Sequence, residues 1–175
     1  PYDWIQAYHV GGRSLLWGRH TQRWSDFDFT GPERDGFAVD WPIRYKDLAP
    51  WYSYVEKFVG ISGNKDGLEI LPDGEFIKPY ELSCVEKHFG QIVNQKYPDR
   101  HVIIARTANL SQADKIHQSV GRSQCQNRNL CERGCPYGGY FSSNSATLPA
   151  AYNTENLTLK THSIAHSIIY DETTQ

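Results

Sequence analysis

The spacing of apolar positions predicts a helix within residues 40–60 of this chain. Four side chains recur at helical spacing and are expected to form its buried stripe: Trp51, Tyr54, Val55 and Phe58. Asp47 is a candidate cap, because its carboxylate can accept hydrogen bonds from the free amides of the first turn. Pro50 fits that first turn, where a missing N–H group is tolerated, and Gly60 and Gly63 end the helix.

A second amphipathic pattern predicts a helix over residues 80–96, and shorter apolar runs predict strands. The apolar side of this helix consists of Leu82, Val85, Phe89, Ile92 and Val93. Cys84 lies within the pattern and is expected to be a small buried residue. Residues 102–105 predict a buried strand, and residues 157–169 predict one or two strands. Two Asp-Gly turn signals predict short strands or an irregular hairpin over residues 64–79.

Helices mixed with short strands define the fold class that we expect, which is α+β. Residues 107–145 are polar and irregular, and a polar stretch of this length is usually functional or disordered. A short helical turn is expected at residues 146–152. We treat residues 1–175 as one unit with four segments: 1–60 with the first helix, 61–106 with a helix and strands, 107–150 as a cysteine-rich loop, and 151–175 as a strand.

Composition and charge narrow the class of protein. The 175 residues include 18 Lys and Arg against 20 Asp and Glu, whereas nucleic-acid binders usually carry a basic excess. No apolar run reaches the roughly 18 residues that a transmembrane helix needs. The chain contains no Met, all five Trp lie within residues 1–51, and the four Cys come later. This uneven distribution favours a slice of a larger enzyme over a mature chain whose leader was removed.

The sharpest local signal is a C-x5-C-x3-C run followed directly by proline, formed by Cys125, Cys131 and Cys135. Thiolates on a short loop can converge on one metal ion or cluster, and a trailing Cys-Pro is typical of iron–sulfur ligand runs. Zinc would need a fourth ligand, from His117 or Cys84, and usually binds C-x2-C pairs, which are absent. The spacing also leaves open a disulfide with one free thiol, and three unligated thiols.

The charge around this run is strongly basic. Residues 100–135 carry six Lys and Arg against two Asp and Glu. A basic surround stabilises an anionic cluster or a pyrophosphate, although solvated basic surfaces are also common.

Four stretches, in chain order, resemble the glucose–methanol–choline (GMC) family of flavin-dependent oxidoreductases. Residues 11–18, Gly-Gly-Arg-Ser-Leu-Leu-Trp-Gly, look like its Gly-Gly-x-Ser/Thr signature; alone they would indicate only a loop with adjacent glycines. Residues 40–52 are similar to the helix entry that begins with Trp-Pro in that family. Residues 131–151, which end in Ser-Ala-Thr-Leu-Pro-Ala-Ala, and residues 156–159 resemble its cysteine-proline stretch and the strand that follows.

The resemblance implies an enzyme that binds FAD and oxidises an alcohol, with hydride leaving the carbinol carbon for the flavin. It places Gly11, Gly12 and Ser14 against the flavin and its pyrophosphate. We assign Trp17 to the cofactor site as well, with a sugar site or the core as its alternatives. Leu16 stands where relatives with covalent flavin carry a histidine, so FAD is expected to bind non-covalently.

The cysteine run has a counterpart within the same family. Subgroups that pass electrons onward, such as the bacterial sugar and gluconate dehydrogenases, carry C-x5-C-x3-C around a [3Fe-4S] cluster. The match favours Cys125, Cys131 and Cys135 as cluster ligands. It also favours a dehydrogenase that uses a cytochrome or other electron acceptor over an oxidase. The substrate class implied is a sugar, glucoside, sugar acid or other alcohol.

Other family features are missing from the chain. The G-x-G-x-x-G fingerprint is absent, and no histidine lies in the family's catalytic motif, so the catalytic residues are expected outside this chain. We therefore expect the central part of a flavoenzyme, inactive alone, with segment 1–60 contacting the flavin and segment 151–175 returning to the FAD-binding scaffold. A stand-alone, non-catalytic metal-binding or interaction module is the alternative. The compartment, periplasmic or cytoplasmic, stays open.

Overall fold

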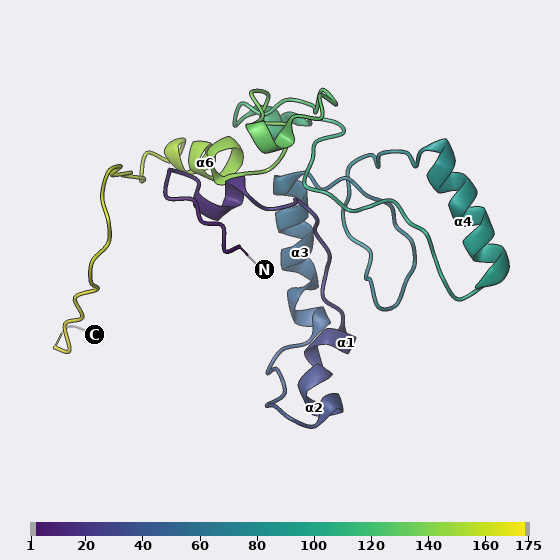
Figure 1. Ribbon diagram of the computed structural model, residues 1–175. Coiled ribbons are helices and arrows are strands. Elements are labelled where there is room, and N and C mark those ends of the chain that lie inside the picture. Colours follow the sequence, from purple (N-terminus) through teal and green to yellow (C-terminus); the bar gives the residue numbers. More distant parts are fainter. Residues whose placement is uncertain (1–2, 174–175) are drawn as a thin grey trace.

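The computed structural model describes residues 3–173, and helices are its main regular elements (Figure 1). The α-helices are α1 (Asp26–Phe29), α2 (Gly31–Asp35), α3 (Tyr45–Val59), α4 (Cys84–Lys96), α5 (Lys115–Gln118) and α6 (Leu148–Tyr152). Two 3₁₀ turns, η1 (Gly12–Leu15) and η2 (Cys131–Arg133), and a π-helix, η3 (Ser143–Thr147), complete the set. Strand pairing within residues 3–173 consists of isolated bridges. The α+β class stays a prediction.

The first predicted helix is confirmed as α3, which lies at the centre of the molecule (Figure 1). Asp47 helps to cap it, because its carboxylate accepts the Arg44 N–H at 2.9 Å. Gly60 ends it with a left-handed backbone (φ 75°), which a residue without a side chain adopts freely. Pro50 lies inside the helix rather than in its first turn.

The predicted buried stripe of α3 is wrong for three of its four members, because Phe58 packs against the core but Trp51, Tyr54 and Val55 are exposed. Trp51 and Tyr54 are 66% and 70% exposed, whereas Glu56 and Val59 are buried. The reason is an ion pair from a distant segment. Arg23 donates from Nε to Glu56 Oε1 at 2.8 Å and from Nη2 to Oε2 at 2.6 Å, and the Glu75 amide donates to the same carboxylate. A buried, fully paired carboxylate therefore turns this face of the helix inward.

The core is small and gathers around the C-terminal end of α3. Val59, Ile61 and Ala108 form its buried centre, and four aromatic side chains pack against them: Trp17, Phe58, Phe76 and Phe141. Isolated bridges join Ser62 to both Ile77 and Thr107. The residues that follow α3 therefore pair with residues far along the chain.

Arg106 ties the turn-rich segment 64–79 to this core. It is 3% exposed, and its Nη2 donates to Asp66 at 3.2 Å and to Asp73 at 3.0 Å. A bridge between Leu68 and Leu71 forms a tight turn within the segment, and the short strands or irregular hairpin over residues 64–79 stay a prediction. Charge-assisted hydrogen bonds from Arg106 hold the segment in place.

Helix α4 confirms the second predicted helix but not its burial. Ser83 and Glu86 form a capping box at its start, with Ser83 N–H donating to the Glu86 carboxylate at 2.7 Å. No residue of α4 is buried, Phe89 is 57% exposed, and Cys84 is exposed rather than the small buried residue that we expected. Figure 1 shows α4 lying apart from α3, and Val102 lies beside its Gly90, where an added Cβ would come within 3.5 Å of the Val102 Cβ.

The strands predicted at residues 102–105 and 157–169 are wrong for the described structure, which assigns no strand to either segment. Segment 157–169 runs away from the body of the molecule (Figure 1), and Ile164 and Ile168 are both 96% exposed. An extended segment becomes a strand only when another strand supplies hydrogen bonds, and no described segment lies there to supply them. The expected helical turn at residues 146–152 is confirmed by η3 and α6.

No helix among residues 3–173 combines the length and the apolar character that crossing a bilayer requires.

Candidate functional site

Two segments that lie 129 residues apart meet at the candidate site. Ser14 Oγ, in the Gly-Gly-x-Ser segment, accepts the Ser143 N–H at 2.9 Å. Asn144 Nδ2 donates to the Val10 carbonyl at 3.0 Å. A side chain on Gly11 would place its Cβ 2.8 Å from Asn144 Oδ1, and Gly11 has a φ of 100°. Glycine is therefore required at this position by both its backbone conformation and its close neighbour.

The second of these segments is the π-helix η3. Ser142 caps it, because its Oγ accepts the Ser145 N–H at 3.2 Å, and Ala146 anchors it as a fully buried residue. Pro149 follows in α6 and has no N–H to give the Ser145 carbonyl, which explains why the backbone widens before α6 begins. Single π turns of this kind are frequent at functional sites.

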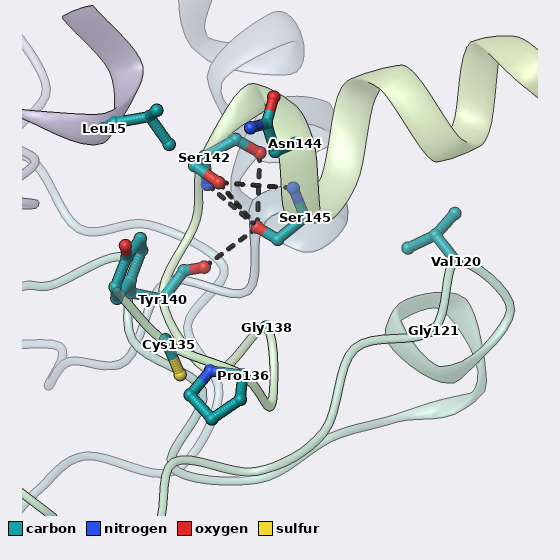
Figure 2. A pocket seen from close by; sticks show the side chains of 10 residues that line it. All are labelled: Leu15, Val120, Gly121, Cys135, Pro136, Gly138, Tyr140, Ser142, Asn144 and Ser145. Carbon is teal, nitrogen blue, oxygen red and sulfur yellow. Dashed lines mark hydrogen bonds between the residues drawn. The ribbon is translucent and has the colours of Figure 1, made fainter. Parts of the chain in front are cut away.

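A cavity of about 360 Å³ lies between these segments and the cysteine run (Figure 2). It is lined by Leu15, Val120, Gly121, Cys135, Pro136, Gly138, Tyr140, Ser142, Asn144 and Ser145. Figure 2 shows the hydrogen-bonded side chains of Ser142, which caps η3, and Ser145 on one side and Cys135 with Pro136 on another. The volume and the mixture of polar and apolar walls suit a small organic molecule or part of a cofactor.

The three cysteines of the run line a second, small recess together. Cys125 Sγ accepts the Asn127 N–H at 3.4 Å, and Cys135 Sγ accepts the Gly139 N–H at 3.3 Å. These two hydrogen bonds fix the positions of the Cys125 and Cys135 sulfur atoms. The predicted ligands Cys125, Cys131 and Cys135 are thus brought to one place.

Backbone pairing holds the ends of the cysteine run together. The Cys125 N–H donates to the Leu110 carbonyl at 2.8 Å, and the Leu110 N–H donates to the Gly139 carbonyl at 2.7 Å. A Cβ on Gly139 would lie 3.0 Å from Cys125 Cα, so only glycine allows this approach without a shift. Leu110 therefore acts as the bridge that sets the spacing of the first and last cysteine.

A buried cation lies behind Cys135. Arg122 is 1% exposed and donates from Nη1 to the Val59 carbonyl at 2.7 Å and from Nε to the Gly138 carbonyl at 3.0 Å. Its Nη2 has no hydrogen-bond partner among residues 3–173. Burial lowers the pKa of Arg122 to about 10, and the nearby Cys135 opposes that shift.

Tyr80 lies on the other side of the cysteines. Its hydroxyl is buried and makes no hydrogen bond of normal geometry within the described part of the chain. Burial is the main cause that raises the pKa of Tyr80, and the neighbouring Cys125 and Cys131 raise it further. Buried donors without acceptors are costly, so Tyr80 and Arg122 together fit an acceptor-rich, anionic group held by the cysteines.

The structure also bears on the alternatives to a cluster. Among the described residues, no group of three His, Cys, Asp or Glu side chains is placed to hold a metal ion. His117 already uses both ring nitrogens, since Nδ1 accepts the Asp114 N–H and Nε2 lies 3.1 Å from the Lys57 carbonyl. Cys84 is exposed on α4, and all four cysteines are free thiols. The zinc and disulfide alternatives therefore lack support, and because the same finding covers Cys125, Cys131 and Cys135, the [3Fe-4S] cluster stays a prediction from the sequence.

The remaining predicted cofactor residues serve the protein's own structure. Ser14 Oγ also donates to the Gly11 carbonyl at 2.6 Å, so its one hydroxyl proton is already used within the protein. Trp17 Nε1 donates to the Phe141 carbonyl at 3.2 Å, and its ring packs on the core. A Cβ on Gly12 would meet only the Ala7 carbonyl, at 3.9 Å. Trp17 also lines a cavity of about 600 Å³ beside η1.

Sequence reasoning missed three residues of the site. Asn144 lies within the stretch 131–151 that carries the family resemblance, but no spacing rule singles it out. Arg122 is one of six basic residues in a polar segment, and nothing in the sequence distinguishes it from a solvated arginine. Tyr80 stands at the edge of a predicted helix. Only the tertiary structure shows that Asn144 lines the cavity of Figure 2 and that Arg122 and Tyr80 lie near the cysteines.

The chain matches no protein-family model. It is similar in sequence to curated enzymes that are named as dehydrogenases and oxidases. The fructose dehydrogenase large subunit of Gluconobacter japonicus is 26% identical over 141 residues, which make up 81% of this chain and 25% of that protein.

Two further relatives belong to the same broad class. Paromamine 6'-oxidase of Streptomyces fradiae is 26% identical over 164 residues, or 91% of this chain and 28% of that enzyme. The 2-methyl-1,2-propanediol dehydrogenase of Mycolicibacterium austroafricanum is 28% identical over 120 residues, or 61% of this chain and 21% of that enzyme. The chain thus corresponds to 21–28% of the length of these three relatives.

Proposed function

We propose that this chain is part of an FAD-dependent dehydrogenase of the GMC type that oxidises the CH–OH group of a sugar or related alcohol. One observation carries the proposal. The Gly-Gly-x-Ser segment is locked onto η3 through Ser14 and Ser143, and the cavity beside this contact is also lined by Cys135. A flavin segment and a candidate electron-relay ligand thus border the same space.

The residues that line the cavity of Figure 2 suit a flavin, because they form a rigid surface for its ring system. Ser145 Oγ donates to the Tyr140 carbonyl at 3.0 Å, and Asn144 bonds the Val10 carbonyl, so the polar side of the cavity is already held in place. A wall held by its own hydrogen bonds positions a ring without losing further side-chain freedom. FAD bound here supplies the hydride acceptor for alcohol oxidation, and Leu16 gives it no covalent attachment.

The cysteine run fits a [3Fe-4S] cluster by its donor chemistry. Cys125, Cys131 and Cys135 would supply the thiolates, and a bound cluster supplies one-electron transfer to an external acceptor such as a cytochrome. Arg122 adds positive charge behind Cys135, and Tyr80 adds a hydroxyl near Cys125. Both features stabilise an anionic group at this place.

The substrate class follows from the relatives' names. Fructose and paromamine both carry sugar hydroxyls, and 2-methyl-1,2-propanediol is a small alcohol. We therefore propose a sugar or sugar-like alcohol as the substrate. The stand-alone metal-binding or interaction module is the weaker alternative, because the sequence relationships are all to oxidoreductases.

The test is an absorbance spectrum with iron and sulfide assays of the full-length protein, purified without oxygen. We expect flavin bands and about three irons per chain. The Cys131→Ser variant should lose the iron and keep the flavin. Cys84→Ser is the matched control, since Cys84 is exposed and does not line the recess, and it should keep both. Unchanged iron in Cys131→Ser would contradict the cluster, and absent flavin would contradict the enzyme class.

A further inference from the structure

The proposed function leaves one large cavity beside η1 without a role. This η1 cavity has a volume of about 600 Å³, which lies within the range of sites that bind small organic molecules. Leu15 lines both the η1 cavity and the cavity of Figure 2, so the two spaces share a wall residue. The charged residues of its lining are Asp3, Arg13, Arg19 and Glu132.

Arg19 is a buried cation whose hydrogen bonds are incomplete. It is 7% exposed, whereas Asp3, Arg13 and Glu132 are all exposed to solvent. Its Nη2 donates to the Leu15 carbonyl at 3.3 Å, but its Nε is buried and has no hydrogen-bond partner within residues 3–173. No carboxylate in that part of the chain forms an ion pair with Arg19. A buried donor without an acceptor is costly, so we expect a ligand to supply the acceptor.

The backbone holds Arg19 in this position at a cost in free energy. Arg19 has a φ of 64°, in the left-handed region that a residue with a side chain rarely adopts. The Ala108 N–H donates to the Arg19 carbonyl at 2.8 Å, and a bridge joins the next residue, His20, to Thr107. Backbone strain of this kind persists where the surrounding structure enforces it, and it is concentrated at ligand sites.

Arg19 also connects the η1 cavity with the proposed flavin site. Its guanidinium carbon lies over the ring of Tyr140, 3.9 Å from the ring centroid. Tyr140 is one of the residues that line the cavity of Figure 2. Stacking on a ring leaves the edge of a guanidinium group able to donate hydrogen bonds. A molecule bound to Arg19 in the η1 cavity would therefore lie next to the proposed flavin site.

We infer that the η1 cavity binds the substrate and that Arg19 selects a substrate with a carboxylate group. The inference rests on the proposed function and narrows its substrate class to hydroxy acids of the sugar-acid type. A carboxylate oxygen gives Arg19 Nε the acceptor that it lacks within the described chain, and a charge-assisted hydrogen bond is stronger than a neutral one. The carboxylate only anchors the molecule, because the bonds that change are those of its CH–OH group.

The rest of the lining suits the hydroxyl-bearing part of a sugar acid. Leu16 and Trp17 offer apolar surface to its carbon chain, and the carboxylates of Asp3 and Glu132 can accept hydrogen bonds from its hydroxyl groups. The same two carboxylates disfavour a phosphate ester, because a charge of about −2 is repelled more strongly than a single negative charge. The lining therefore favours a carboxylate as the anion.

The experiment compares the binding of D-gluconate and D-sorbitol to the full-length protein by isothermal titration calorimetry. The two molecules differ at one end of the chain, where gluconate has a carboxylate and sorbitol has a CH₂OH group. We expect gluconate to bind at least about tenfold more tightly. Equal affinities in the unmodified protein would overturn the inference, as would tighter binding of D-glucose 6-phosphate than of gluconate.

Variants of Arg19 test its part in this preference. Arg19→Gln should weaken gluconate binding at least about tenfold and change sorbitol binding by less than about twofold. Arg19→Lys keeps the positive charge and should retain part of the preference. Arg34→Gln is the matched control, because Arg34 also lies over an aromatic ring, that of Phe27 at 3.7 Å, but lines neither cavity, and it should bind normally.

The result for sorbitol separates a ligand role of Arg19 from a structural one. If Arg19→Gln weakens the binding of gluconate and sorbitol equally, Arg19 serves the fold alone and the inference is wrong. Flavin absorbance of the same samples reports separately on the proposed function. Protein that holds flavin but does not prefer gluconate would contradict this inference alone, whereas protein without flavin would contradict the proposed function.

Discussion

The two halves of the site differ in how their polar groups are satisfied. In the contact between η1 and η3, Ser14 and Asn144 give or accept hydrogen bonds on both sides, and the serines of η3 bond one another. Around the cysteines, Arg122 Nη2 near Cys135 and the Tyr80 hydroxyl near Cys125 are buried donors without a partner among the described residues, and neither residue lines the recess itself. One half is complete with the protein's own atoms, and the other is not.

This difference distinguishes a preformed surface, whose polar groups already bond one another, from a site whose polar groups need a ligand. A polar contact that satisfies itself is rigid before anything binds, which suits the positioning of a planar cofactor. An unpaired buried donor costs about 1–3 kcal/mol, and this cost is removed when an acceptor-rich group binds next to it. We therefore expect the unsatisfied donors near the cysteines to be satisfied when such a group binds there. The following changes test that distinction.

The largest effect is expected from Arg122→Met. The change removes the donors to the Val59 and Gly138 carbonyls and leaves both without their charged partner, so we expect a loss of about 3 kcal/mol in the free energy of unfolding. Arg128→Met is the matched control, because Arg128 is exposed on the same loop, and it should change stability by less than about 0.5 kcal/mol. Denaturant unfolding of the full-length protein measures both. Equal effects would show that Arg122 is no more structural than a solvated arginine.

A smaller effect is expected where η1 meets η3. Gly11→Ala combines a left-handed backbone with a Cβ placed 2.8 Å from Asn144 Oδ1, whereas Gly12→Ala carries only the backbone cost of a φ of 48°. We expect losses of about 2 kcal/mol for Gly11→Ala and about 1 kcal/mol for Gly12→Ala. Flavin content should fall further in the first variant.

Rescue distinguishes steric exclusion from backbone strain in this pair. Adding Asn144→Ala to Gly11→Ala removes the atom that the new Cβ would meet, so stability should return toward that of Gly12→Ala. If Gly11→Ala and Gly12→Ala lose stability and flavin equally, the close contact with Asn144 does not shape the site.

Local rules predicted the helices well but not their burial. The patterns at 40–60 and 80–96 correspond to α3 and α4, because capping and helical spacing depend on neighbouring residues. The face that α3 buries depends on Arg23, which lies 33 residues before Glu56. A periodicity of apolar residues assigns a glutamate to solvent, so it cannot anticipate a buried ion pair made by a distant arginine.

The sequence predicted only the part of the site that depends on residues close together in the chain. The three cysteines lie close in sequence, and a short loop brings them to one recess without help from distant residues. The contact of Ser14 with Ser143 joins ends of the chain that no spacing relates, and only the family resemblance pointed to both stretches. Arg122 gave no signal, because burial of a cation is decided by the carbonyls that surround it, Val59 and Gly138.

A pH dependence is expected from His117, which supports the end of α3 next to the site. His117 is 1% exposed, and its Nδ1 accepts the Asp114 N–H, so the folded protein needs the neutral ring. Burial lowers the pKa of His117 below its usual value. The unfolded chain takes up a proton below about pH 6.5, so stability is full above that pH and is lost as the pH falls.

Hydrogen exchange can measure this loss locally. The Gly60 amide bonds the Glu56 carbonyl and the Arg122 amide bonds the His117 carbonyl, so protection factors at both should fall from pH 7 to pH 5. His117→Gln should remove most of this dependence, because glutamine does not titrate. Protection that falls equally in the variant would assign the effect to other groups.

The smallest effect on stability is expected from Tyr80→Phe, and it sharpens the comparison most. In iron-free protein the Tyr80 hydroxyl has no partner, so its removal should change stability by less than about 0.5 kcal/mol. Tyr45→Phe is the matched control, because the Tyr45 hydroxyl accepts from Arg23 at 2.8 Å and its loss should cost about 1 kcal/mol. Equal costs would mean that the Tyr80 hydroxyl is already satisfied.

In iron-loaded protein, we expect Tyr80→Phe to change the reduction potential of the cluster more than Tyr45→Phe does. A hydroxyl that donates toward a ligating sulfur raises the reduction potential of a cluster, so Tyr80→Phe should shift the midpoint potential to a more negative value. Tyr45 lies in the Arg23–Glu56 network, away from the recess, and Tyr45→Phe should leave the potential unchanged. A potential that moves in Tyr80→Phe alone would identify its hydroxyl as a group kept for the ligand rather than for the fold.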